Sequence, residues 1–89
     1  MKAIVTVVGK DQVGIIAAVC VKLAEFNVNV LDISQTVMQG YFTMMMVVDM
    51  CAASVAVAEL AVCMEEMGNE KGLSIRVQRE DIFEAMHRI

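Results

Sequence analysis

Hydrophobic and polar residues follow two different periods along this chain, one typical of strands and one typical of helices. Ala3–Val8 is a continuous β-branched run ("AIVTVV") and predicts a buried strand. From Val13 to Phe26 the apolar residues recur at helical spacing, with Lys22 and Glu25 on the opposite side. This pattern predicts a helix that stops at Asn27. Its apolar stripe consists of Ile16, Val19, Cys20 and Leu23.

The middle of the chain predicts a hairpin of two strands. Val28–Gln39 alternates in part between apolar and polar positions, and Tyr41–Asp49 ("YFTMMMVVD") follows after a turn at Gln39 and Gly40. The second strand is apolar on both sides, so it needs cover on both sides. In the first strand we expect Leu31, Ile33 and Val37 on one face and Asp32, Ser34 and Thr36 on the other.

The helical period returns in the last third of the chain. It runs from Ser54 to about Glu70, and Gly72 is the expected stop. Leu73–Gln78 then alternates cleanly and predicts a half-buried strand. Asp81, with Glu84 three residues later, has the form of a capping box. We therefore expect a short terminal helix that carries Ile82, Phe83 and Met86; the stripe of the long helix is Val57, Leu60, Ala61, Met64 and Met67.

The predicted order βαββαβ is typical of an α+β, ferredoxin-like sandwich. Right-handed crossovers place both helices on one face of a four-stranded antiparallel sheet, and the short C-terminal helix follows. No linker, repeat or low-complexity segment divides the 89 residues, so we expect a single domain spanning residues 1–89. The other sheet face is bare in a monomer, and we expect this face or an edge of the sheet to meet a second subunit.

The composition also favours an oligomer. Hydrophobic residues make up 58% of the chain, which is more than so small a domain can bury alone. The best membrane candidate, Met44–Met64, is interrupted by Asp49, Ser54 and Glu59. The first residues lack the apolar run and cleavage site of a signal peptide. We therefore expect a soluble, cytoplasmic homodimer or higher oligomer with no membrane partner.

Charge and ligand-forming residues exclude two further classes of function. The net charge of −4 provides no basic face for phosphates, so we expect no direct nucleic-acid partner. Cys20, Cys51 and Cys63 are widely spaced, and His87 is the only histidine. We interpret the three cysteines as small hydrophobic residues in a reducing compartment. Adjacent methionines at 44–46 point to opposite faces, so no metal site and no cofactor are expected.

The segment "VVGKDQVGII" joins the first strand to the first helix and contains two glycines at the spacing of a phosphate-binding loop. Ile15 and Ile16 follow Gly14, where such a loop requires lysine and then serine or threonine. The third glycine of a dinucleotide loop is also absent. Acylphosphatases are similar in length and element order, but their loop carries an arginine that is absent here. No nucleophile–base pair is visible either, so we expect no catalytic residues and no enzyme activity.

The same loop has the features of a carboxylate-binding site. Gly14 opens the first helix, so the backbone N–H groups of Val13–Ile16 form a donor-rich, electropositive pocket. Lys10 and Gln12 offer further polar contacts, and Asp11 is a candidate partner for an ammonium group. The alternative interpretation is that Asp11 only caps the helix and the glycines only permit the turn. The residues alone leave both interpretations open.

The run "GKDQVGIIAAVCVKLAEFNVNVLDISQTV" resembles the ACT domain, and the resemblance extends over essentially the whole chain. It is most similar to small stand-alone ACT proteins, which are related to the ACT domains of the glycine-cleavage transcriptional repressor. The resemblance implies a regulatory module that binds amino acids or related small molecules between paired domains. The implied ligand-binding residues are Asp11, Gln12, Val13, Gly14 and Ile15 of the loop, and Asn29 at the entry to the second strand.

The leading hypothesis is a homo-oligomeric ACT domain that binds a small-molecule effector and regulates a protein partner in trans. The first alternative is a ligand-free structural or interaction module. The second is a small acylphosphatase-like enzyme, which the missing arginine disfavours.

Overall fold

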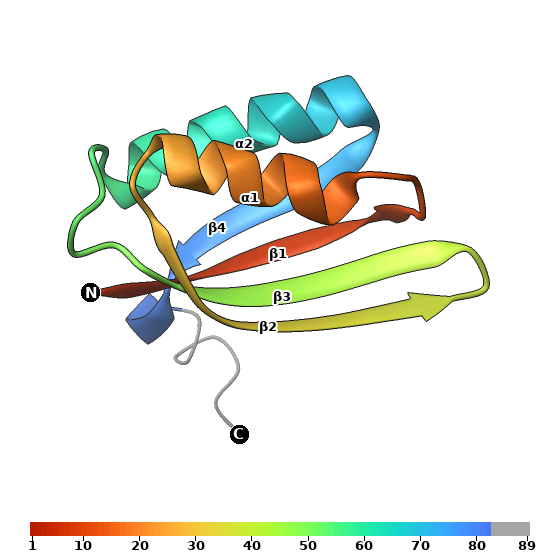
Figure 1. Cartoon of the computed structure of the whole chain (residues 1–89), viewed down its shortest axis with the longest axis horizontal. Helices are drawn as coiled ribbons and strands as arrows, with labels where there is room; N and C mark the ends of the chain where they lie inside the picture. Colours follow the sequence, from red (N-terminus) through yellow and green to blue (C-terminus); the bar gives the residue numbers. More distant parts are fainter. Residues whose placement is uncertain (83–89) are drawn as a thin grey trace.

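The computed structural model describes residues 1–82 and has the predicted order of elements (Figure 1). The elements are β1 (Lys2–Lys10), α1 (Ile15–Glu25), β2 (Asn29–Met38), β3 (Tyr41–Asp49), α2 (Val57–Lys71) and β4 (Leu73–Arg79). The strands form one antiparallel sheet in the order β2-β3-β1-β4, and both helices lie above the same face. The predicted α+β, ferredoxin-like fold is confirmed.

The core lies between this sheet face and the two helices. In β3 the even-numbered residues are buried and the odd-numbered ones lie on the other face, where Tyr41 and Met45 are 58% and 39% exposed. Both predicted helical stripes face the core, because Val19, Leu23, Leu60 and Met64 are fully buried. The methionines of β3 and α2 fill the space between the layers, a role that suits their flexible side chains.

The predicted turn and stop residues are confirmed by the backbone. Gln39 and Gly40 both have positive φ angles, 51° and 82°, as a tight hairpin turn requires. Gly72 ends α2 with a φ of 71°. Asn27 follows α1 with a φ of 57°, and its side-chain amide donates to the carbonyl of Ala52 at 2.9 Å.

Both helices begin later than predicted. α1 starts at Ile15 because Gly14 adopts a left-handed conformation with a φ of 85°, which the helix cannot include. α2 starts at Val57 because Ser54 is engaged elsewhere. The backbone N–H and the hydroxyl of Ser54 both donate to the carbonyl of Phe26, at 2.9 and 3.3 Å. Ser54 therefore joins the loop to the end of α1 instead of opening the second helix.

β2 is an edge strand with a bulge that the alternation did not predict. Val30 lies opposite Val48 and Asp32 lies opposite Val47, so Leu31 is an extra residue. Beyond the bulge, Ile33 and its alternate neighbours share the helix-side face with the buried residues of β3, as the register shows. Leu31, Ile33 and Val37 are nevertheless 47%, 42% and 55% exposed, since this strand lies beyond the cover of the helices.

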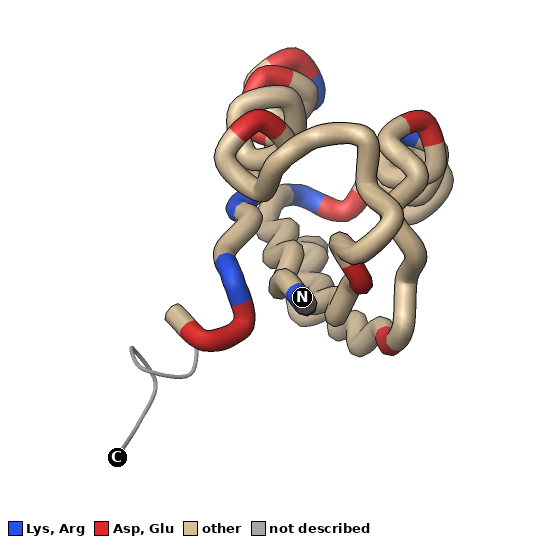
Figure 2. The backbone as a smooth tube through the Cα atoms, turned by 90° about the vertical axis from the view of Figure 1, so that its left-hand side faces the viewer, with Lys and Arg blue, Asp and Glu red and all other residues tan. Residues whose placement is uncertain are grey.

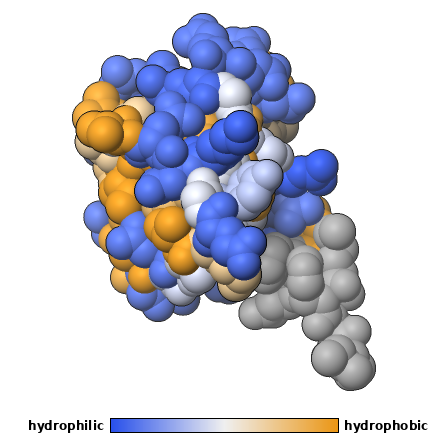
Figure 3. All heavy atoms as spheres, turned by 90° about the vertical axis from the view of Figure 1, so that its right-hand side faces the viewer, coloured by the Kyte–Doolittle hydropathy of each residue, from blue (hydrophilic) through white to orange (hydrophobic). Residues whose placement is uncertain are grey.

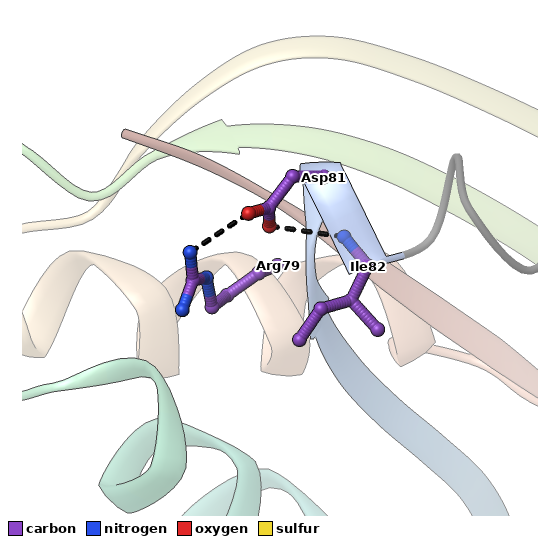
Figure 4. Close-up of polar contacts among 3 residues, drawn as sticks. All are labelled: Arg79, Asp81 and Ile82. Carbon is purple, nitrogen blue, oxygen red and sulfur yellow. Dashed lines mark hydrogen bonds and ion pairs between the residues drawn. The ribbon is translucent and has the colours of Figure 1, made fainter.

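The chain turns into a helical conformation directly after β4. Figure 4 shows the Asp81 carboxylate between two partners, the Arg79 guanidinium at 2.8 Å and the Ile82 backbone N–H at 2.9 Å. The helical backbone starts at Glu80, one residue before the predicted Asp81. The other residues of the predicted terminal helix, Phe83, Glu84 and Met86, lie outside the described residues.

The cysteines agree with their prediction in part. All three are unpaired, and Cys20 and Cys63 are half-buried. Cys51 is exposed. Its sulfur accepts a hydrogen bond from the Met1 amine at 3.0 Å, which raises the pKa of that amine. Its backbone N–H donates to the Asp49 carboxylate at 2.9 Å, which lowers the pKa of Asp49.

Within residues 1–82, no helix is long and apolar enough to cross a membrane.

The close approach of α2 to β4 depends on Gly68, which predicts the sign of a mutation. A Cβ atom on Gly68 would lie 2.6 Å from the carbonyl oxygen of Leu73. We expect Gly68→Ala to lower the free energy of unfolding by about 1–3 kcal/mol through overpacking. Helix propensity alone predicts the opposite sign, a gain of about 1 kcal/mol. Urea denaturation measures the difference, with the exposed neighbour substitution Asn69→Ala as the control. A Gly68→Ala variant at least as stable as the parent would contradict this packing.

Candidate functional site

The loop between β1 and α1 is held by two hydrogen bonds to distant parts of the chain. The backbone N–H of Asp11 donates to the carbonyl of Gly40 in the β2–β3 turn at 2.8 Å. The side-chain amide of Gln12 donates to the carbonyl of Lys71 at the end of α2, at 3.1 Å. The loop is thus positioned against both the hairpin and the second helix, although its side chains are exposed.

The N-terminus of α1 is open to solvent. Gly14 is its N-cap, and no side chain among the described residues caps it. The first bond inside the helix runs from the Ala18 N–H to the Gly14 carbonyl at 2.9 Å, so the preceding N–H groups of the first turn have no partner within the helix. A Cβ atom built on Gly14 has nothing within 4 Å, which shows that the space above the turn is empty of protein.

This geometry resolves one of the two interpretations of Asp11. The carboxylate of Asp11 does not cap α1, so the interpretation of Asp11 as a helix cap is wrong. Asp11 is exposed on the same short loop as the open helix end. The loop therefore presents both backbone donors and a carboxylate within a few residues of chain. The partial positive charge of the helix end suits an anion, and the carboxylate suits a cation.

The other predicted loop residues contribute in different ways. Val13 is fully exposed, whereas Ile15 is only 4% exposed and packs in the core. Ile15 therefore fixes the start of α1 with its side chain and leaves only its backbone N–H for a ligand. Gln12 already uses its amide to hold the loop on Lys71, so its role in one chain is to position the loop.

Asn29 does not lie with the loop in a single chain. It pairs with Asp49, which in turn pairs with Lys2 at the start of β1, whereas the loop follows Lys10 at the other end of that strand. Eight residue steps of about 3.3 Å separate these ends, or roughly 26 Å. The structure brings Asp11, Gln12, Val13, Gly14 and Ile15 together and leaves Asn29 at the opposite end of the sheet.

The sequence patterns did not single out the apolar surface beside the loop. Val37, Met38 and Tyr41 flank the turn that holds Asp11 and are 55%, 68% and 58% exposed. Figure 3 looks at this end of the molecule and shows hydrophobic side chains gathered along one side of it. A hollow of about 330 Å³ lies there, lined by Thr36, Met38, Gln39, Tyr41 and Thr43. The only sequence signal was the apolar character of the residues on both sides of the turn.

The described part of the chain contains no group of three or more His, Cys, Asp or Glu side chains that could hold a metal ion. His87 lies outside the described residues. The chemistry that the loop offers is reversible binding through hydrogen bonds and charge.

Comparison with known proteins agrees with the fold and identifies close relatives. A family model described as the ACT domain matches residues 2–78. A UPF0237 protein of Bifidobacterium longum is 56% identical over 88 residues, which are 99% of this chain and 98% of that protein. The solved structure of an ACT domain protein from Streptococcus pneumoniae is 47% identical, with a TM-score of 0.83 and coverage of 98% of each chain.

A more distant solved structure extends the likeness in fold. It is a putative glycine cleavage system transcriptional repressor, with a TM-score of 0.74 and 18% identity. The alignment covers 86% of this chain and 44% of that chain. At this level of identity the match concerns the fold alone. The resemblance drawn from the loop and the helix that follows it is confirmed.

The role of Gln12 as the anchor of the loop is testable by amide exchange. We expect Gln12→Ala to raise the exchange rate of the Asp11 amide several-fold, because the loop loses its bond to Lys71. The global free energy of unfolding should fall by less than about 1 kcal/mol, since the bond is exposed. Native-state hydrogen exchange measured by NMR gives both quantities. Lys10→Ala is the control. If the Asp11 amide exchanges at the same rate in both variants, Gln12 does not anchor the loop.

Proposed function

This chain belongs to the ACT-domain family, whose members are in general regulatory ligand-binding domains, and from that premise we propose that it binds an amino acid as a regulatory effector. The effector site is the loop from Asp11 to Ile15. The protein acts in the cytoplasm as a homo-oligomer and influences a protein partner in trans. Its unpaired cysteines fit a reducing compartment.

The open N-terminus of α1 is the observation that supports this proposal most strongly. The first-turn N–H groups have no capping side chain, and the left-handed glycine before them leaves the approach clear. An amino-acid carboxylate satisfies these donors and is favoured by the helix dipole. The ammonium group of the same ligand then pairs with the exposed carboxylate of Asp11. One zwitterion thus meets both charges that the loop presents.

The free edge of β2 supports the proposed homo-oligomer. Nearly all its residues are exposed, and Leu31, Ile33, Val37 and Met38 are large and apolar. A long apolar strand edge without protective lysines or prolines favours pairing with another strand. Two copies of β2 that pair antiparallel about a two-fold axis set the start of one strand against the end of the other.

This arrangement also gives Asn29 a place in the effector site. Asn29 stands at the start of β2, and the turn at Gly40, which holds Asp11, stands just beyond its end. In the proposed dimer, Asn29 of the second subunit lies beside the loop of the first. An effector bound between the two subunits favours the dimeric state, and a partner protein that distinguishes the two states responds to the effector.

Substitution of Gly14 tests the effector site. Asp and Asn are nearly identical in shape, and both tolerate the left-handed conformation better than other side chains. We expect Gly14→Asp to weaken amino-acid binding by at least about tenfold relative to Gly14→Asn, because its carboxylate occupies the helix end and repels the carboxylate of the ligand. Isothermal titration of both variants and the parent against a panel of amino acids measures this. The proposal fails if no amino acid binds the folded parent, or if the two variants bind equally.

Substitution on β2 tests the oligomer. We expect the parent to be dimeric at micromolar concentration and Ile33→Lys to raise the dimer dissociation constant by at least about tenfold, because the lysine charge would have to be buried in the interface. Val62→Lys is the matched control, since it places the same charge at an exposed apolar position on α2, where Val62 is 56% exposed against 42% for Ile33. Sedimentation equilibrium provides the constants. A monomeric parent, or equal effects of the two variants, would exclude this interface.

A further inference from the structure

A groove of about 540 Å³ runs between α2 and the outer edge of β4. Ala61, Glu65 and Asn69 line it from α2, four residues apart on one side of the helix, and residues 73–78 line it from the strand. In Figure 2, α2 lies at the upper left above β4 and carries most of the acidic residues of the helical layer. The groove is separate from the loop at the N-terminus of α1.

The strand side of this groove is a free sheet edge. β4 pairs with β1 along one side only, and no other described strand lies beside it. In an antiparallel edge strand, every second residue points its N–H and C=O groups away from the sheet. The stretch from Ser74 to Val77 therefore offers backbone donors and acceptors to an added strand, directly below the α2 side of the groove.

Polar side chains line the groove, and several of them have no partner among residues 1–82. Among residues 1–82 the ion pairs are Lys22–Glu25 and Arg79–Asp81, so neither Glu65 nor Arg76 is paired. The Asn69 side chain likewise makes no hydrogen bond within this part of the chain. Glu65 belongs to the helix side of the groove. Arg76 lies on the opposite face of the sheet, because its neighbours Ile75 and Val77 face the core.

These charges distinguish between possible occupants. In a strand, alternate side chains point to opposite faces, so an added strand meets Glu65 with one residue and Arg76 with the next. A basic residue followed by an acidic one complements both. A second copy of this chain does not, because a symmetric β4–β4 pair sets the acidic side of α2 against itself.

We propose that the groove between α2 and β4 binds an extended segment of a partner protein, which adds a strand to β4 and places a lysine or arginine against Glu65 and an aspartate or glutamate against Arg76. This names the surface through which the proposed regulation in trans acts, and it rests on that part of the proposed function. Amino-acid binding uses the N-terminus of α1, so the two proposals can fail separately.

The test uses the intact protein and the fluorescein-labelled peptide Val-Thr-Lys-Glu-Val-Thr-Val, followed by fluorescence anisotropy without any amino acid present. We expect saturable binding that Glu65→Lys weakens by at least about tenfold. Glu66→Lys is the matched control, because it makes the same change of net charge on an exposed neighbour outside the groove. A peptide with Glu in place of Lys should bind Glu65→Lys better than it binds the parent, and Arg76→Glu should weaken binding of the original peptide.

Strand addition has its own readout. Methylation of alternate backbone nitrogens in the peptide should abolish binding, because the added strand then lacks its donors. Circular dichroism establishes that each variant is folded. The proposal is overturned if the peptide fails to bind the folded parent, if Glu65→Lys and Glu66→Lys weaken it equally, or if the methylated peptide binds as well. The proposal is also overturned if the amides from Ser74 to Val77 become more protected from hydrogen exchange as the concentration of the protein alone rises, because that result would assign this edge to a second copy.

Discussion

The structure depends on one constraint, which is that two helices cover only one face of a four-stranded sheet. β3 meets this constraint by placing apolar residues on its helix side, where Phe42, Met44, Met46 and Val48 are buried. Its odd-numbered side has no such cover, and β2 extends beyond the helical layer after Val30, which still packs against the core. Many of the exposed large hydrophobic residues therefore lie on the bare face and the β2 edge, while others, such as Val13, Val21 and Val62, lie on the loop and the helices.

The two edges of the sheet differ in chemistry, so the two ends of the sheet offer different surfaces to other proteins. The β2 edge is apolar, with Asp32 as its one charged residue. The β4 edge carries Arg76 and faces Glu65 across the groove. Apolar edges associate with like edges, whereas a surface of mixed charge selects a partner with the complementary pattern. The proposed self-association and the proposed recognition of another protein would in this way use opposite edges of one sheet.

The fold was largely predictable from the sequence because its determinants are local. The alternation in β3, the helical stripes and the turn at Gly40 are each readable within about ten residues. The errors arose where a distant partner decides the local outcome. Ser54 could not be excluded as a helix start without knowing that Phe26 lies beside it, and the bulge at Leu31 depends on pairing with β3.

The same distinction applies to the candidate site. The loop from Asp11 to Ile15 is contiguous, and its role at a helix end could be inferred from Gly14 alone. The bond between Gln12 and Lys71 joins residues 59 positions apart and has no sequence signature. The groove beside β4 is likewise hidden, because it depends on Gly68 allowing α2 to approach the strand. The separation of Asn29 from the loop follows from strand direction and becomes visible only when the sheet is assembled.

The contacts of the loop limit how an effector can influence a partner. Its anchors, Asp11 to Gly40 and Gln12 to Lys71, link the proposed effector loop to the turn beside the proposed dimer edge and to the helix above the β4 groove. Each such bond contributes about 1 kcal/mol, so changing one of them on binding alters an affinity elsewhere by about fivefold. A larger response requires a change of quaternary state, in which many contacts change together. Regulation by this small domain is therefore expected to act mainly through assembly at the β2 edge, with the α2–β4 groove as the surface by which the assembled form holds its target.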